Sequence, residues 1–314
     1  MTMKGIKWIT IAAIILMIAT PAFGAISKED ASKSVSSYVL SGETSEIYGP
    51  YTYENHAYYY AEISTDKSIT GILIVDAESG KIIEDLEIAK KIIYTKTYLA
   101  DATPENLAAY NATRDGFNNA SVAYREKSEA YKKEIPLYKA EERAKFETIV
   151  QSYQEAATLY DGLSDIMKRA AETQADIIKG NASYENAVKF SNQMTEYENS
   201  LKKMGTIYDK IMGETNAYYG VLINGAATYK LNATEMSDYK LLSETAIKQE
   251  KDRMITQVIT LIQEDNANTE ERVNSEMEVM EVRLKTRNSI PGFGILAAVG
   301  MVLVAGFLIR RKEK

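Results

Sequence analysis

The sequence predicts an α+β N-terminal module, with one helix on an antiparallel sheet, then a mainly α long-helix bundle or coiled-coil region and a C-terminal transmembrane segment. Three patterns predict this class. Runs rich in Tyr, Ile and Val alternate with turn-forming residues between 46 and 83, which is typical of short strands. From Pro104 onward, apolar residues recur at helical spacing with few breaks. Residues 290–309 carry no charge, and about 20 apolar residues suffice to cross a bilayer core of about 30 Å.

The N-terminal end predicts export. Two lysines precede an apolar run over 8–20, and Ala22 and Gly24 place small residues at the −3 and −1 positions of a cleavage site after Gly24. The alternative is an uncleaved N-terminal anchor, but the run is short for a span. The predicted domains are a signal peptide 1–24, the α+β module 25–100, the helical region 101–289 and a C-terminal signal 290–314.

Composition excludes several classes of function. The formal net charge is −7, and the exported part is more acidic still, which argues against nucleic-acid binding because that needs a basic patch. There is no cysteine, so disulfides, thiolate metal sites and cysteine nucleophiles are excluded.

The module 25–100 is expected to begin with a helix and continue as strands. Ser27 is placed to cap the helix, whose apolar positions follow at helical spacing until Gly42. Strands are predicted over 46–53, 57–64 and 70–76, with turns between them and a final short strand at 81–83.

Four helices are predicted in the region 101–289, over 104–133, 136–179, 184–219 and 234–286. Val273, Met277, Met280 and Leu284 step by four, three and four residues, which is the spacing of a coiled-coil seam. We expect an earlier helix of the same chain to cover this seam. A second copy of the chain is the alternative.

No constellation predicts catalysis, a metal or a cofactor. His56 is the only histidine and is expected in a solvated turn. Adjacent acids such as Glu141 and Glu142, or Glu270 and Glu271, point about 100° apart on a helix and make no acid–base pair. The methionines of the helical region are expected to fill the core. The tyrosines between 48 and 60 are expected to pack across strands, and a sticky aromatic face for a partner or sugar is the alternative.

Four N-glycosylation sequons occur in this acidic chain, at Asn111, Asn119, Asn181 and Asn232. Asn181 and Asn232 are expected in loops, which makes them the favoured acceptors. Asn111 and Asn119 are eight residues apart on one predicted helix.

The residues at the start of the charge-free stretch carry a resemblance. Pro291, Gly292 and Phe293 precede an Ala/Gly/Val/Leu span and a short basic tail. This arrangement resembles the PGF-CTERM sorting signal of archaeal surface proteins. The resemblance implies that an archaeosortase-type enzyme removes the span and that the new C-terminus is joined to a membrane lipid. Many members carry a Thr- or Pro-rich spacer before the triplet, whereas here a charged helical pattern precedes it. A retained single-pass anchor is therefore the alternative.

A second resemblance lies in the module 25–100. Residues 71–83, with Val75, Asp76 and Ala77 leading through Gly80 to Lys81, resemble the second half of a PepSY-type repeat. This resemblance implies a small extracytoplasmic fold, in some relatives linked to restraining peptidases, and implies no catalytic site.

The predicted function is that of a non-enzymatic archaeal cell-surface protein, membrane-anchored at its C-terminus and associated with the envelope or S-layer. Its α+β module is expected to stand distally on a helical stalk. The expected partners are the membrane, the processing enzyme, and other surface proteins or glycans, with no nucleic acid and no cofactor. The alternatives are a ligand-binding, sensor-like ectodomain and a peptidase-restraining PepSY protein.

Overall fold

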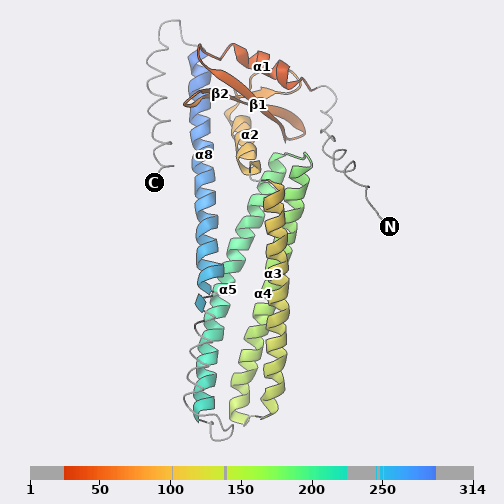
Figure 1. Ribbon diagram of the computed structural model, residues 1–314, viewed down its shortest axis with the longest axis vertical. Helices are drawn as coiled ribbons and strands as arrows, with labels where there is room; N and C mark the ends of the chain where they lie inside the picture. The colour runs from red at the N-terminus through yellow and green to blue at the C-terminus, as the bar shows by residue number, and fades with distance from the viewer. Residues whose placement is uncertain are drawn as a thin grey trace, which may run out of the picture. The chain divides into compact units, whose positions relative to one another are not determined.

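The computed structural model describes residues 25–100, 102–137, 140–224, 245, 248–249 and 251–287 (Figure 1). The chain divides into two compact units. Unit 1 gathers three stretches, the chain up to Thr103, then Ala175–Val188, and the chain from Thr269 on. Unit 2 gathers Pro104–Gln174 and Lys189–Asn268. The boundary predicted near residue 100 lies close to Thr103, but unit 1 also takes in the turn between two long helices and the end of the last one.

Unit 1 contains a three-stranded antiparallel sheet in the order β1-β2-β3. The strands are β1 Thr44–Tyr53, β2 His56–Thr65 and β3 Ser68–Asp76, so the three predicted strands are confirmed. The central strand β2 is buried over most of its length, because helices cover both faces of the sheet. The predicted final strand at 81–83 forms only a single bridge, between Val75 and Ile82.

The first hairpin turns through two residues in the left-handed region, Glu54 with φ 50° and Asn55 with φ 63°. Two consecutive positive φ values suit the twist of a tight hairpin. His56 is therefore the first residue of β2, paired with Tyr53, and it is exposed. Gly49 and Pro50 form a bulge in the edge strand β1, between Tyr48 and Tyr51.

Helix α1, Lys28–Ser36, covers one face of the sheet (Figure 1). The Ser27 hydroxyl accepts a hydrogen bond from the Asp30 backbone N–H, as the capping pattern predicts. Ala31 and Val35 are fully buried against side chains of β2 and β3 such as Ile63 and Leu73. The predicted N-terminal helix is confirmed.

Helix α2, Leu86–Leu99, covers the other face, and the prediction of a single helix on the sheet is wrong. Asp85 caps it by accepting hydrogen bonds from two backbone N–H groups. Ala89, Ile92 and Ile93 lie on one helical face and are fully buried. The capping residue and the spacing of these three are the sequence signals of α2.

The last helix, α8, spans Val258–Arg287. The predicted seam is buried within the chain, Val273 being 2% exposed and Met280 fully buried. Its partners are the sheet and α2, through side chains such as Ile72 and Ile92. An earlier helix of the same chain, α2, therefore covers the seam as expected, but the sheet, which was not expected as a partner, covers it as well. An apolar stripe requires a partner surface but does not specify which one.

Unit 2 is helical. Its helices are α3 Pro104–Glu134, followed by a short 3-10 helix η1 Ile135–Leu137, then parts of α4 Ala140–Ile178 and α5 Tyr184–Asn224. A π-helical turn η2, Asp252–Gln257, leads into α8. The three predicted long helices are confirmed, and the predicted break falls at Pro136. The described part of the fourth predicted helix is helical, while its start lies outside the described residues.

The core of unit 2 is built from aromatic and aliphatic side chains of these helices. Phe117, Tyr160 and Tyr208 are buried at its centre, with Leu201 and Met204 beside them. Met204 thus fills the core as predicted. Among the described residues no helix is long and apolar enough to cross a membrane. The predicted span 290–309 and the predicted signal peptide 1–24 lie outside those residues.

Candidate functional site

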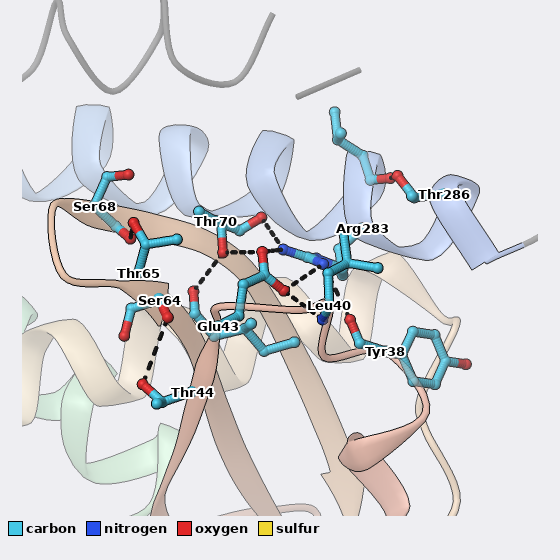
Figure 2. Close-up of polar contacts among 12 residues, drawn as sticks. Tyr38, Leu40, Glu43, Thr44, Ser64, Thr65, Ser68, Thr70, Arg283 and Thr286 are labelled. Carbon is cyan, nitrogen blue, oxygen red and sulfur yellow. Dashed lines mark hydrogen bonds and ion pairs between the residues drawn. The ribbon is translucent and has the colours of Figure 1, made fainter. Parts of the chain in front are cut away.

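The most elaborate polar arrangement in unit 1 is an ion pair between Arg283 of α8 and Glu43, which precedes β1 (Figure 2). The guanidinium donates from Nη2 to Glu43 Oε1 at 2.7 Å and from Nη1 to Glu43 Oε2 at 3.1 Å. It also donates to the backbone carbonyls of Tyr38 at 3.0 Å and Thr70 at 2.7 Å. Arg283 thus joins α8 to β3 and, at both Tyr38 and Glu43, to the segment between α1 and β1.

Both partners are removed from solvent, with side-chain exposures of 2% for Arg283 and 7% for Glu43. Glu43 also accepts hydrogen bonds from the Thr70 hydroxyl at 2.7 Å and the Leu40 backbone N–H at 2.8 Å. Burial by itself raises the pKa of Glu43, but the hydrogen bonds from Arg283, Thr70 and Leu40 outweigh it and hold the pKa below its ordinary value. The carboxylate therefore stays charged against the guanidinium.

Gly71 makes room for the arginine. A Cβ at this position would lie 3.0 Å from Arg283 Cζ and closer still to Nε, so a larger residue and the observed arginine conformation exclude each other. Gly71 lies in β3 beside Thr70, whose carbonyl accepts from the same guanidinium. The close approach of α8 to β3 thus depends on a residue without a side chain.

A second polar cluster lies between α8 and the sheet. Glu276 of α8 is 10% exposed in its side chain and lies 3.4 Å from Lys96 Nζ of α2. The Tyr60 hydroxyl donates to Glu276 Oε2 at 3.0 Å, and Lys96 lies over the Tyr60 ring at 4.4 Å from its centroid. Arg272 pairs with Glu276 from the same helix at 3.5 Å. This cluster holds α8 to both α2 and β2.

The carboxyl of Glu62 on β2 lies in the field of this cluster. Burial raises the pKa of Glu62, and the negative charges of Glu276 and Glu46 raise it further. The positive charges of Lys96 and Arg272 lower it, but the pKa still lies above its ordinary value. Burial, with nearby acidic charges, also raises the pKa of Tyr60, which stays a neutral hydrogen-bond donor.

The turn between α4 and α5 attaches to the free edge of β1. The Thr52 backbone N–H donates to the Ala182 carbonyl at 2.9 Å, and Thr52 forms a parallel bridge with Ser183. The ring of Tyr184 packs edge-to-face on Tyr53, with centroids 5.5 Å apart. Covering an edge strand in this way removes a site for unwanted strand pairing.

The tyrosines of the sheet are used in packing. Tyr58, Tyr59 and Tyr60 are at most 5% exposed, and the three on β1, Tyr48, Tyr51 and Tyr53, are partly buried and pack on the same core as α2 and α8. Burial, followed by the negative charge of Glu276, raises the pKa of Tyr51 to about 12. Cross-strand packing is confirmed, and these rings do not form an exposed aromatic face.

The predicted glycosylation sites lie in different surroundings. Asn181 is exposed in the turn between α4 and α5, as predicted. Asn119 is exposed on α3, whereas Asn111 on the same helix is half-buried and donates from Nδ2 to the Leu107 carbonyl at 3.0 Å. Asn232 lies outside the described residues, as do the predicted processing residues Ala22, Gly24, Pro291, Gly292 and Phe293.

Unit 2 carries an open groove of about 600 Å³ between α4 and α5. Polar and aliphatic side chains line it together, among them Gln151, Glu155, Leu159, Lys203 and Ile207. Lys210 pairs with Glu155 at 3.0 Å. Within the described stretches, no group of three or more His, Cys, Asp or Glu side chains is arranged to hold a metal ion.

Sequence reasoning missed the residues of both polar clusters. Glu276 and Arg283 are seven residues apart and each lies three residues after a member of the apolar seam, Val273 or Met280. Charged residues beside a buried stripe are a signal for buried ion pairs. Their partners could not be named, because Glu43 lies 240 residues away from Arg283.

The chain was also compared with known proteins. Comparison with protein-family models, with curated proteins and with solved structures finds no match.

Proposed function

We propose that this is an exported, non-enzymatic protein of the archaeal cell surface, anchored through its C-terminal stretch and acting as a structural or binding module of the envelope. One observation carries the proposal. Helix α8 is fixed to unit 1 by the buried Arg283–Glu43 pair and ends at Arg287. The charge-free stretch begins three residues later, at 290. An anchor in that stretch would therefore follow a packed helix within a few residues of the chain.

The use of the buried charges supports a structural role. Arg283 and Glu276 both join α8 to elements on the other side of the core, and each contacts more than one element. Breaking a buried pair by removing one partner is strongly destabilising, so these contacts resist displacement of the helix. Their chemistry is that of attachment, since each charge lies beside a charge of opposite sign.

The packing of α8 bears on the order of the parts that we propose. The sequence led us to expect a distal α+β module on a helical stalk. The described end of α8 instead belongs to unit 1, with only residues 288–290 between it and Pro291. In the proposed protein the α+β unit is therefore next to the anchor.

The test is the mass of the protein purified from its native membrane, intact and after proteolysis. We expect a chain that begins at Ala25, lacks peptides from 294–310, and carries a lipid near 289–293. The variant Phe293→Ala should retain the span and lose the lipid. Peptides from 294–310 in the mature protein would show that the span is retained as an anchor and is not exchanged for a lipid. Recovery of the whole chain in the soluble fraction would overturn anchoring itself.

A further inference from the structure

Several exposed aliphatic residues adjoin the Arg283–Glu43 pair, either in the chain or through a backbone hydrogen bond. Of the seven large hydrophobic side chains that are exposed in the described part of the chain, three adjoin this network, namely Leu40 at 50%, Ile69 at 40% and Val282 at 36% exposure. The Leu40 N–H donates to Glu43 (Figure 2). Ile69 precedes Thr70 and Val282 precedes Arg283. We call these three residues the apolar rim.

The apolar rim lies near the described end of α8. Arg283 is four residues before the end of α8 at Arg287, and the charge-free stretch starts at 290. An extended chain spans at most about 3.6 Å per residue, so these three residues reach no farther than about 11 Å. An anchored stretch would thus bring a lipid surface close to the rim.

The opposite end of the sheet lies well away from the rim. Ile69 is at the β2–β3 hairpin, whereas the β1–β2 hairpin at Tyr53 and His56 marks the other end. Strands of this length, ten residues in β2, span roughly 30 Å at about 3.3 Å per residue. The α4–α5 turn attaches at that far end, through Thr52, and Ile178 closes α4 just before it.

We infer that the apolar rim is a lipid-contacting surface, through which unit 1 rests on the outer leaflet beside its own anchor. The inference relies on the anchoring in the proposed function. Aliphatic side chains gain free energy by entering the boundary between headgroups and acyl chains. The tether keeps the rim at high effective concentration near that boundary, so three side chains suffice where they would not bind a membrane alone.

The absence of cysteine allows unique labelling. The full chain is prepared as Ile69→Cys and as the matched control Ile178→Cys, two isoleucines of unit 1 with exposures of 40% and 39%. Each is labelled with a fluorophore and placed in phosphatidylcholine vesicles that contain a nitroxide-labelled lipid. We expect severalfold stronger quenching at Ile69 than at Ile178, and the same strong quenching in Leu40→Cys and Val282→Cys.

Flotation of the same samples separates the two proposals. Vesicles that float with the protein but quench both positions equally, or neither, overturn the lipid contact and leave anchoring intact. Protein that does not float overturns the anchor and the rim contact together. A pyrene label that forms excimers at Ile69 without lipid quenching assigns the rim to a second copy of the chain, which also overturns the inference.

Discussion

Arg283 and Glu43 lie 240 residues apart in the chain and form a two-point ion pair, with Nη2 to Oε1 at 2.7 Å and Nη1 to Oε2 at 3.1 Å. The pair is almost completely buried. Because it joins the last described helix to the segment between α1 and β1, it closes unit 1 as a single packed body. The predictions below test that closure and its consequences.

Removing one member of the pair should be costly. Glu43→Gln keeps the shape but leaves a buried guanidinium without its counter-charge, which we expect to lower the free energy of unfolding by about 3–5 kcal/mol in urea titrations. Glu281→Gln is the control, since its pair with Lys285 on the same helix is exposed and should be worth under about 1 kcal/mol. The double variant Glu43→Gln/Arg283→Met should lose less than the sum of the single losses. Strict additivity would contradict the pairing.

Gly71→Ala should destabilise unit 1, because the new methyl group would collide with Arg283. Overpacking of this kind typically costs about 1–3 kcal/mol. Gly162→Ala in α4 is the matched control. Apart from its chain neighbours and the backbone of its own helix, no atom lies within 4 Å of its added Cβ, and alanine is favoured over glycine in a helix by up to about 1 kcal/mol. Thermal melts should therefore move in opposite directions. Equal shifts would mean that Arg283 moves aside without cost.

Two carboxyls should give opposite pH dependence. The pKa of Glu43 is lowered in the folded state, so its stabilisation is complete above the ordinary value of 4.5 and is lost as the pH falls through the lower folded pKa. The pKa of Glu62 is raised, so its ionisation destabilises the fold as the pH rises above 4.5. Glu62→Gln should then raise stability at neutral pH and have little effect in acid. A gain in stability that persists in acid would show that the effect does not come from the ionisation of Glu62.

Truncating a side chain of the α8 seam should destabilise the protein as a core substitution does. Met280 is fully buried, and Met280→Ala should cost about 2–5 kcal/mol. Val282→Ala, two residues away and 36% exposed, should change stability by less than about 0.5 kcal/mol. Both are measured by chemical denaturation alongside the oligomeric state. A Met280 variant that melts like the parent but dissociates an oligomer would place the partner surface in a second copy.

Glycan should occur at Asn181 rather than at Asn111. Asn181 is exposed in a turn, whereas the Asn111 side chain is half-buried and hydrogen-bonded to its own helix. Peptide mapping of the native protein should find modified Asn181, and Asn181→Gln should remove that mass. Ser183→Ala is a poorer test, because the Ser183 hydroxyl also accepts from the Asn186 N–H at the start of α5. Glycan confined to Asn111 would contradict the exposure argument.

The sequence by itself determined the elements whose signals are local. The two hairpins follow from alternating Tyr, Ile and Val residues between turn formers, and α1 follows from the Ser27 cap and its apolar spacing. The long helices follow from the helical periodicity that runs with few breaks from Pro104 onward. The spacing of Val273 and Met280 predicted a buried face on α8, and both residues are buried. The same local reasoning overlooked α2, although Asp85 and the residues behind it carry the usual signals.

Only the tertiary structure decided what those elements pack against. Apolar spacing shows which face of α8 is buried but does not show what covers that face. In the structure, the sheet and α2 cover it. Arg283 and Glu43 carry no mutual signal, because an ion pair depends on distance in space and they are 240 residues apart. Three further features could not be predicted for the same reason: the space that Gly71 leaves for Arg283, the attachment of the α4–α5 turn to β1, and the assembly of unit 1 from three stretches of the chain. Each arises from the fit of surfaces that meet only after the chain has folded.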